Sequence, residues 1–563
     1  MIYHCEDRTC NYWDEGEKLP ERCPRCGRKL LRANEADMTG DDWTALGNTL
    51  WDAEASDKKR MVDCFRKAAY LGSAWGVCNL GICMEQGNGV EADPVQAFWL
   101  YQQAVEMGSL NAVCCLGVCY EHGIGTAPDA KQAAELYRKA AEYGSPRGQM
   151  LLARAFHDGI GVEADAAEAV HWVRAAAYQR YGEGMYRLGV CYEYGDGVEQ
   201  NWEHAVHWFR EAAESGVSAA MADLGYCYEK GCGVEQSWEQ AFSWYRRGAE
   251  CGYPVSMSNL GLCYKRGYGV EQNWQEAVKW YEQGAQCGHL QSMNNLACCY
   301  EDGEGVEQNE ERALYWYRRG AEAGSDYCMY CLGWNYSNGE GVEQNMTEAI
   351  RWYTDAAEGG NADAMHNLGW LYDHGEGVEQ DMKKAICWYE RAAEQNHPAA
   401  MNSLGECYAM GRGVPRDLET AMEWYRRAAE LGEAMADYNM GWHLEQAGKL
   451  SEAYAHYRKA ADGNDDSAWW ALGRFYENGV VVAQDGKEAR RCYETGEKLG
   501  SVKCKMRLAR CKLLGIGGRR AKNAGLDLCR QALELAKESS EKEDYGYEAE
   551  MNLLRRTIAE NES

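Results

Sequence analysis

Four cysteines near the start of the sequence have the type and spacing that would suit a metal ion. Cys5 and Cys10 form one pair and Cys23 and Cys26 a second pair, with twelve residues between the pairs. Four thiolates in two short-range pairs are the ligand set of a closed, tetrahedral zinc site. Residues 1–34 are too few to fold by hydrophobic burial alone, so the metal would provide the folding energy. The sequence therefore predicts one structural zinc ion held by these four cysteines.

The second cysteine pair lies in the sequence Cys-Pro-Arg-Cys-Gly at residues 23–27, which resembles one knuckle of a zinc ribbon. The first pair departs from the ribbon pattern because four residues rather than two separate its cysteines, and His4 stands beside Cys5 as an alternative ligand. A degenerate ribbon without metal and a redox-active cysteine pair are the competing interpretations. A closed four-thiolate site has no open position for a substrate, so the predicted zinc is structural rather than catalytic.

The rest of the sequence offers no constellation of residues that is typical of an enzyme. Its 12 histidines have no serine or cysteine partner at a recurring spacing, and no Walker loop, nucleophile elbow or His-Glu-x-x-His motif occurs. We therefore expect a non-enzymatic protein with no catalytic residues. An enzyme, which would need a cleft with paired acid and base groups, is the remoter alternative.

The chain is strongly acidic. Its 59 basic and 88 acidic residues give a formal net charge of -29, which disfavours a nucleic-acid or anionic-membrane surface and favours basic or neutral partners. No stretch approaches the roughly 20 apolar residues needed to cross a bilayer, and residues 1–10 contain no signal-peptide-like apolar run. Many of the 26 cysteines recur at one position, so we expect a cytoplasmic protein with small, buried thiols in a reducing compartment.

The elements that would position these residues follow from a repeat. The pair Leu-Gly followed by a Tyr recurs every 36 residues from Gly81 to Gly441, with Ala sometimes replacing the Gly, and we call this Gly or Ala the marker residue. Further markers before and after this series give about fourteen units over residues 40–540, an array rather than one compact core. The markers are Gly47, Gly81, Gly117, Ala153, Gly189, Gly225, Gly261, Ala297, Gly333, Gly369, Gly405, Gly441, Gly473 and Ala509.

One unit, residues 218–252, shows how each repeat would fold. Apolar residues at helical spacing predict a first helix that ends near Lys230. Gly231 and Gly233 would end it by adopting backbone conformations closed to other residues. Ser237 would then cap a second helix, with Gln240 three residues later completing a capping box.

Two antiparallel helices would cross at Gly225 and Ala241, where a larger side chain would force them apart. Stacked units would join their apolar stripes into one core and form a superhelix with a concave inner face. Trp-Tyr pairs on the second helices could stack on a ligand, but their register with the core favours packing, and cysteines two residues after the marker are likewise expected to be buried. The pairs are residues 244/245, 280/281, 316/317, 352/353, 388/389 and 424/425, and the cysteines are Cys83, Cys119, Cys191, Cys227, Cys263, Cys299 and Cys407.

The combination of Leu-Gly-x-x-Tyr, Gly-x-Gly-Val, Ala-x-x-Trp-Tyr and Ala-Ala at a fixed period resembles the Sel-one-like repeat, a relative of the tetratricopeptide repeat. The resemblance implies an all-α fold, a right-handed α-solenoid superhelix, whose family members act as adaptors that gather other proteins. The units around Gly441 and Ala509 depart from the pattern in their turns. The expected organisation is a zinc-ribbon-like module at residues 1–34, a solenoid at 35–541, and a C-terminal capping helix and tail at 542–563.

Three positions of each first helix would face the inner groove if the register of tetratricopeptide repeats carries over. These are the positions three and two residues before the marker and one residue after it. Asparagines at the middle position would either hold the backbone of an extended peptide or bond to the neighbouring repeat. Aromatics at the other two positions would either anchor a ligand or pack between repeats. The predicted peptide-binding residues are Tyr330, Trp334, His366, Asn367, Trp370, Tyr438, Asn439 and Trp442.

These patterns favour a protein-interaction scaffold that binds a peptide or protein segment in its inner groove. A row of glutamates in the Val-Glu-Gln loops would keep the array soluble or dock a basic partner. The main alternative is a nucleic-acid-associated regulator acting through the zinc module, but residues 1–34 carry 7 basic and 6 acidic side chains and thus lack a basic surface. The glutamates are Glu199, Glu235, Glu271, Glu307, Glu343 and Glu379.

Residues 503–530 are unusually basic for this chain, with nine Lys or Arg against the single acid Asp527. This end is expected to contact an acidic surface, either on a second copy or on a partner. An ordinary fluctuation of charge in a degenerate terminal repeat is the competing interpretation.

Overall fold

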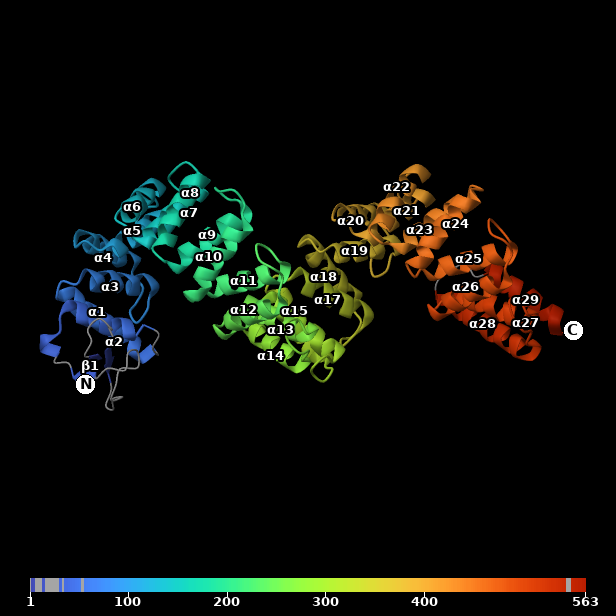
Figure 1. Cartoon of the computed structure of the whole chain (residues 1–563), viewed down its shortest axis with the longest axis horizontal. Helices are drawn as coiled ribbons and strands as arrows, with labels where there is room; N and C mark the ends of the chain where they lie inside the picture. The colour runs from blue at the N-terminus through green and yellow to red at the C-terminus, as the bar shows by residue number, and fades with distance from the viewer. Residues whose placement is uncertain are drawn as a thin grey trace. The chain divides into compact units, whose positions relative to one another are not determined.

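The computed structural model describes residues 2–5, 13–15, 30–32, 35–51, 55–542 and 548–562. Helices that follow one another in pairs dominate these residues (Figure 1). The chain divides into two compact units, Met1–Ser292 and Met293–Ser563, with the division inside α15 (Leu290–Asp302).

A small antiparallel sheet precedes the helices of the first unit. Its strands are β1 (Ile2–Cys5), β2 (Trp13–Glu15) and β3 (Leu30–Arg32), in the order β2-β1-β3. Ile2 pairs with Glu15, and Tyr3 pairs with Arg32. The term all-α therefore describes the repeats and not the N-terminal end of the chain.

The first unit continues with a short 3-10 turn at Glu35–Asp37 and then with helices that pair as first and second helix of each repeat. Their bounds are α1 (Gly40–Thr49), α2 (Ala55–Tyr70), α3 (Ala74–Gln86), α4 (Pro94–Glu106), α5 (Leu110–His122), α6 (Ala130–Glu142), α7 (Pro146–Asp158), α8 (Ala166–Tyr178), α9 (Gly182–Tyr194), α10 (Trp202–Glu214), α11 (Ser218–Lys230), α12 (Trp238–Glu250), α13 (Pro254–Arg266) and α14 (Trp274–Gln286).

The second unit repeats the same arrangement up to α28, so the described residues hold fourteen helix pairs, as the repeat count predicts. One further helix, α29, lies within the residues predicted to cap the array. After α15 the bounds are α16 (Glu310–Glu322), α17 (Asp326–Asn338), α18 (Met346–Glu358), α19 (Ala362–His374), α20 (Met382–Glu394), α21 (Pro398–Met410), α22 (Leu418–Glu430), α23 (Ala434–Gln446), α24 (Leu450–Asp462), α25 (Asp466–Asn478), α26 (Gly486–Lys498), α27 (Val502–Leu514), α28 (Lys522–Lys542) and α29 (Glu548–Glu562).

Helix boundaries within a repeat fall where the sequence predicts them. After Lys230, the last residue of α11, Gly231 and Gly233 have φ angles of +73° and +69°, left-handed conformations that favour glycine. Before α12, the Ser237 hydroxyl accepts a hydrogen bond from the backbone N–H of Gln240 at 3.3 Å. The cap is thus confirmed, although only the Ser237 half of the predicted capping box forms at this described helix end.

The marker position requires a small residue because an aromatic ring of the second helix packs against it. A Cβ atom added at Gly225 would lie 2.6 Å from the Tyr245 ring, and one at Gly369 would lie 2.5 Å from the Tyr389 ring. Such contacts are too close for a packed core to absorb without shifting. The space that a side chain at Gly225 would need is therefore filled by the Tyr245 ring of the second helix.

Burial confirms the packing role of the Trp-Tyr pairs. All six tyrosines are fully buried, and the tryptophans before them are buried or half-buried. The predicted cysteine spacers are also buried, apart from the half-buried Cys191. Burial raises the pKa of Cys83 to about 11 and that of Cys227 to about 12, so these thiols stay protonated and unreactive at neutral pH.

The glutamine of each Val-Glu-Gln loop ties the loop to the end of the first helix. The Gln236 amide donates a hydrogen bond to the Glu229 carbonyl oxygen at 2.8 Å. Such carbonyls in the last turn have no partner within the helix, so the glutamine satisfies one of them. The glutamates before these glutamines are all exposed, which confirms the predicted acidic row as a solvent-facing feature. The same bond is made by Gln200, Gln272, Gln308, Gln344, Gln380 and Gln484.

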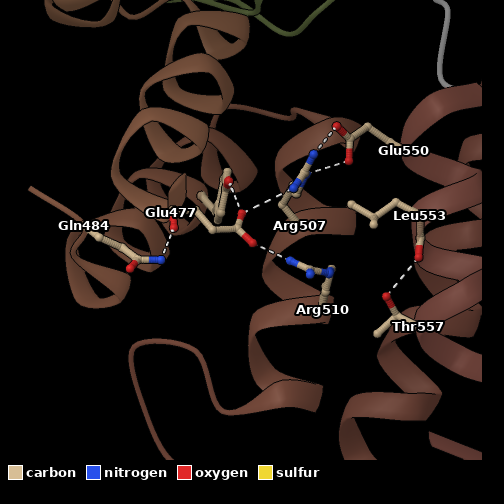
Figure 2. A network of polar contacts seen from close by, with 8 residues as sticks. Glu477, Gln484, Arg507, Arg510, Glu550, Leu553 and Thr557 are labelled. Atoms are coloured by element: carbon tan, nitrogen blue, oxygen red, sulfur yellow. Dashed lines mark hydrogen bonds and ion pairs between the residues drawn. The ribbon is translucent and has the colours of Figure 1, made fainter. Parts of the chain in front are cut away.

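Buried and half-buried charged side chains join the last helices (Figure 2). Arg507 on α27 donates to both carboxylate oxygens of Glu550 on α29, at 2.6 and 2.8 Å, and to Glu477 on α25 at 3.3 Å. Arg510 also donates to Glu477. Leu554 of α29 is buried in the same apolar cluster as residues of α27. Arg507 and Arg510 of the basic segment 503–530 therefore have acidic partners within the chain itself, and so does Arg530, which pairs with Asp527 at 3.3 Å.

Candidate peptide-binding face

The described residues reveal neither a metal site nor a membrane-spanning helix. No group of three or more His, Cys, Asp or Glu within them is arranged to hold a metal ion. Cys10, Cys23 and Cys26 lie outside the described residues, and so does the side chain of Cys5, so the zinc site remains a prediction. No helix in the described ranges combines the length and apolarity that crossing a bilayer requires.

Three of the predicted tryptophans, each one residue after a marker, are exposed on first helices of the second unit. Trp334 on α17 is 45% exposed, Trp370 on α19 is 41% exposed and Trp442 on α23 is 38% exposed. The His374 ring stacks on Trp370 with 4.3 Å between ring centroids, which orients the indole. Exposed indoles are a solubility liability, so a helix position that carries three of them is a candidate binding surface.

The aromatic residues three positions before the marker point into their repeats instead. Each one packs on the buried tyrosine of the second helix. Burial and the neighbouring His397 lower the pKa of His366 to about 4, so its ring is neutral at pH 7. The structure thus divides the predicted aromatic set into exposed indoles and half-buried packing rings. The packed pairs are Tyr330 and Tyr353 at 6.0 Å between centroids, His366 and Tyr389 at 5.7 Å, and Tyr438 and Tyr457 at 5.6 Å.

The two predicted asparagines make hydrogen bonds within the chain. Asn439 Nδ2 donates to Asn402 Oδ1 at 3.0 Å and to Glu406 Oε1 at 3.2 Å, both on α21 of the preceding repeat. Asn367 is a hydrogen-bond partner of Tyr330, whose pKa is raised by burial. These bonds correspond to the alternative role weighed for the asparagines. The described hydrogen bonds of Asn439 use its Nδ2 atom, so its Oδ1 atom could accept a hydrogen bond from a ligand.

Glu406 occupies on α21 the position that tryptophan occupies on α17, α19 and α23. Its side chain is 40% exposed, and Arg412 Nη2 lies 3.7 Å from Glu406 Oε2 while Arg412 Nη1 lies 3.0 Å from Asp373 Oδ1. Burial raises the pKa of the Glu406 carboxyl group. Because two carboxylates share one arginine, this part of the face carries a net negative charge. We name Trp334, Trp370, Glu406 and Trp442 the tryptophan strip.

Sequence reasoning missed three exposed apolar side chains on the same first helices. Tyr327 and Met435 each lie six residues before a marker, and Met410 lies five residues after one. These offsets are seven and four residues from the tryptophan position, so helical periodicity places them on the face of the tryptophan strip. The helical period was readable in the sequence, but the register of tetratricopeptide repeats names three positions of the first helix, and these offsets are not among them.

The family described as Sel1 repeat matches twelve segments of the chain, and these include all of the tryptophan strip. The chain therefore belongs to the Sel1 repeat family. The matched residues are 76–109, 112–145, 146–181, 182–217, 218–253, 254–289, 290–325, 326–361, 362–397, 398–433, 434–465 and 468–501.

Two solved structures resemble the chain. The chain is similar to c5321, a protective antigen present in uropathogenic Escherichia coli strains that displays an SLR fold, with 29% identity over 76% of this chain and 94% of that chain and a TM-score of 0.54. It is also similar to a Sel1 repeat protein from Oxalobacter formigenes, with 28% identity over 56% of this chain and 93% of that chain and a TM-score of 0.44. Comparison with curated proteins finds no match.

Family membership supports an interaction role in general terms. Sel1 repeat proteins generally mediate protein–protein interaction and are typically non-enzymatic. An interaction role suits this fold, because stacked helix pairs present extended faces on which a partner can bind.

Proposed function

We propose that the protein is an interaction scaffold and that the tryptophan strip binds an extended peptide or protein segment. The observation that carries this proposal is the exposure of Trp334, Trp370 and Trp442 at one register position of the first helices. Clustered tryptophans are enriched in binding hot spots, where a partner desolvates them. The first helices line the inner groove of a solenoid, and Asn439 Oδ1 would accept one backbone N–H of the bound segment.

The bound segment carries a basic side chain between apolar ones. Glu406 stands between Trp370 and Trp442 in the order of the repeats, so a partner lysine or arginine would meet a carboxylate with an indole on either side. A cation over an indole face contributes about 0.5–1 kcal/mol at an exposed site. The net charge of -29 would also speed the encounter with a basic partner.

A displayed library of random peptides, selected on the full chain, tests this function. The wild-type chain is expected to enrich peptides that combine basic and apolar residues, because both chemistries meet in the tryptophan strip. A variant in which Trp334, Trp370 and Trp442 are all replaced by alanine is expected to enrich none of them. The control replaces Trp75 and Trp99, two exposed tryptophans of the first unit, and should select like the wild type. Equal enrichment by the strip variant and the wild type would place the binding surface elsewhere.

We further propose that residues 1–34 hold one structural zinc ion through Cys5, Cys10, Cys23 and Cys26, on the strength of their paired spacing. Elemental analysis of the full chain, purified without a metal-affinity step, is expected to give about one zinc per chain. Replacing Cys23 and Cys26 by serine should remove it. The control Cys251→Ser changes an exposed cysteine outside the module and should retain the zinc. Well under one zinc per wild-type chain, with β1 to β3 still formed, would contradict the proposal.

A further inference from the structure

In several repeats, a buried tyrosine ring and a carboxylate close the space between the two helices. Beside the marker Gly117, the Tyr137 ring is fully buried, and its hydroxyl donates a hydrogen bond to Glu121 at 2.6 Å. The ring stands twenty residues after the marker and the carboxylate four residues after it. The same bond joins Tyr101 to Glu85, Tyr245 to Glu229, Tyr317 to Glu301 and Tyr493 to Glu477.

The repeat formed by α7 and α8 replaces all three of these residues. Its marker is Ala153, its ring position is Val173 and its carboxylate position is His157. A pocket of about 720 Å³ is lined by all three residues and by side chains of α7, α8 and α9. Its apolar lining includes Met150, Ala153, Val170, Val173 and Val190.

The pocket has the size and the lining of a ligand site. Its volume lies within the range of about 300–1,000 Å³ that is usual for small-ligand pockets. Val173 is only 6% exposed, so its short side chain forms the base of the hollow where a tyrosine ring would otherwise stand. Arg154 and Val190 also line the pocket. Each lies one residue after a marker, which is the register position that tryptophan occupies in the repeats of the tryptophan strip.

One end of the pocket presents an arginine that has no carboxylate partner among the described residues. Arg147 Nη1 contacts Asn111 Oδ1 at 2.9 Å and Cys115 Sγ at 3.7 Å, and neither partner is a carboxylate. A hydrogen bond with Cys78 and the charge of Arg147 lower the pKa of the Cys115 thiol to about 7. The neighbouring Arg154 is different, because it makes a bidentate contact with the Glu121 carboxylate at 2.6 and 2.8 Å. Arg147 therefore supplies a positive charge at the pocket that an anionic ligand group would neutralise.

The opposite end of the pocket carries a histidine and two aspartates. His157 Nδ1 lies 2.6 Å from Asp158 Oδ1, and His157 Nε2 lies 3.2 Å from Asp196 Oδ2. The hydrogen bond to Asp158 raises the pKa of His157. The other lining carboxylate, Glu183, is paired with Arg187 at 3.4 Å. An anionic ligand group would therefore be repelled by Asp158 and Asp196 and attracted by Arg147, while a hydroxyl group could donate to Asp158 or Asp196. The two ends thus fix the direction of a bound ligand.

We propose that this pocket binds a molecule in which an aromatic ring is joined by a short chain to a carboxylate. The ring occupies the place of the missing tyrosine ring, and the carboxylate pairs with Arg147. Six residues of helix, about 9 Å, separate Arg147 from the marker. Free arylpropanoates and a C-terminal tyrosine or phenylalanine of a peptide share this chemistry. The proposal concerns the first unit and does not rest on peptide binding by the tryptophan strip.

Calorimetric titration of the full chain with 3-(4-hydroxyphenyl)propanoate and with its amide tests the pocket. The wild-type chain is expected to bind the acid saturably and the amide about tenfold more weakly, because a charge-assisted bond is lost. The triple variant Ala153→Gly, His157→Glu, Val173→Tyr rebuilds the set of residues found in the repeats of Tyr137 and Tyr245. It should fold with an unchanged or higher Tm and should bind neither probe, because its own ring fills the pocket.

Two further variants separate the ring from the carboxylate. Arg147→Met should weaken binding of the acid to the affinity of the amide. Arg246 is an exposed arginine of a repeat whose ring position is filled, so Arg246→Met should change the affinity for neither probe. Undiminished binding of the acid by the triple variant, or no saturable binding by the wild type, would overturn the site. If Arg147→Met still bound the acid about tenfold more tightly than the amide, the pairing of the ligand carboxylate with Arg147 would be overturned.

The natural source of the ligand follows from a second pair of probes. A short peptide that ends in tyrosine with a free carboxylate is compared with the free arylpropanoate. Tighter binding of the peptide, lost on C-terminal amidation, supports a peptide C-terminus as the source. Tighter binding of the free acid supports a small-molecule ligand. Binding of the amidated peptide as tight as that of the free peptide would contradict the role of Arg147.

Discussion

Replacing Glu550 by alanine is expected to release α29 from the end of the second unit. Glu550 is buried and accepts two hydrogen bonds from Arg507, so its removal leaves a buried guanidinium with Glu477 as its remaining carboxylate partner (Figure 2). Breaking a buried ion pair from one side costs about 3–5 kcal/mol, and the lower end applies because Glu477 still faces Arg507. Hydrogen exchange over residues 548–562 should rise accordingly.

Two control variants separate the ion pair from helix propensity. Glu548→Ala changes an exposed residue of the same helix and should leave exchange unaltered. The double variant Arg507→Met, Glu550→Leu removes both charges and should recover much of the protection, because apolar replacements of a buried pair are often neutral. Unchanged exchange of α29 in Glu550→Ala would show that the apolar contacts of Leu554 alone hold this helix.

Replacing Trp370 by alanine is expected to cost about 1–4 kcal/mol of binding free energy for a selected peptide, with little loss of folding stability. The indole is 41% exposed and stacks on the ring of His374, so we expect the folded chain to lose few buried contacts. Calorimetry would measure the affinity and the Tm of the same variant. The affinity should fall while the Tm stays close to that of the wild type.

A tryptophan of the second helix provides the matched control. Trp388 is half-buried against the core of the second unit, with Arg391 over its ring at 4.4 Å. Trp388→Ala should therefore lower the Tm and leave peptide affinity intact, the reverse of Trp370→Ala. If Trp370→Ala lowered the Tm sharply and spared the affinity, the exposed indoles would be structural and the peptide would bind elsewhere.

The regular part of this fold was readable in the sequence because its cause is local. Paired glycines such as Gly231 and Gly233 adopt left-handed conformations that few other residues tolerate, so their spacing marks each helix end. The marker glycines and buried tyrosines repeat together because a ring and a Cβ cannot share one place. The glutamine that bonds to the first helix was missed, although its fixed place in the Val-Glu-Gln loops was visible.

The candidate site was only partly predictable, because helical spacing cannot tell which way an aromatic side chain turns. Tyr330 and Trp334 lie four residues apart on one helix, yet Tyr330 packs on Tyr353 while Trp334 is exposed. That difference depends on the neighbouring helix, which a periodic pattern does not specify. The pocket of the first unit was readable in principle, because Val173 interrupts a series of aromatic residues at a fixed offset from the marker.

Hydrogen exchange of the full chain, with and without a peptide selected from the library, tests the central claim most directly. The account predicts that the peptide slows exchange in α17, α19, α21 and α23, the helices that carry the tryptophan strip, and leaves the second helices α18, α20 and α22 largely unchanged. Protection confined to those second helices or to residues 1–34 would contradict the assignment of the first-helix face as the binding surface.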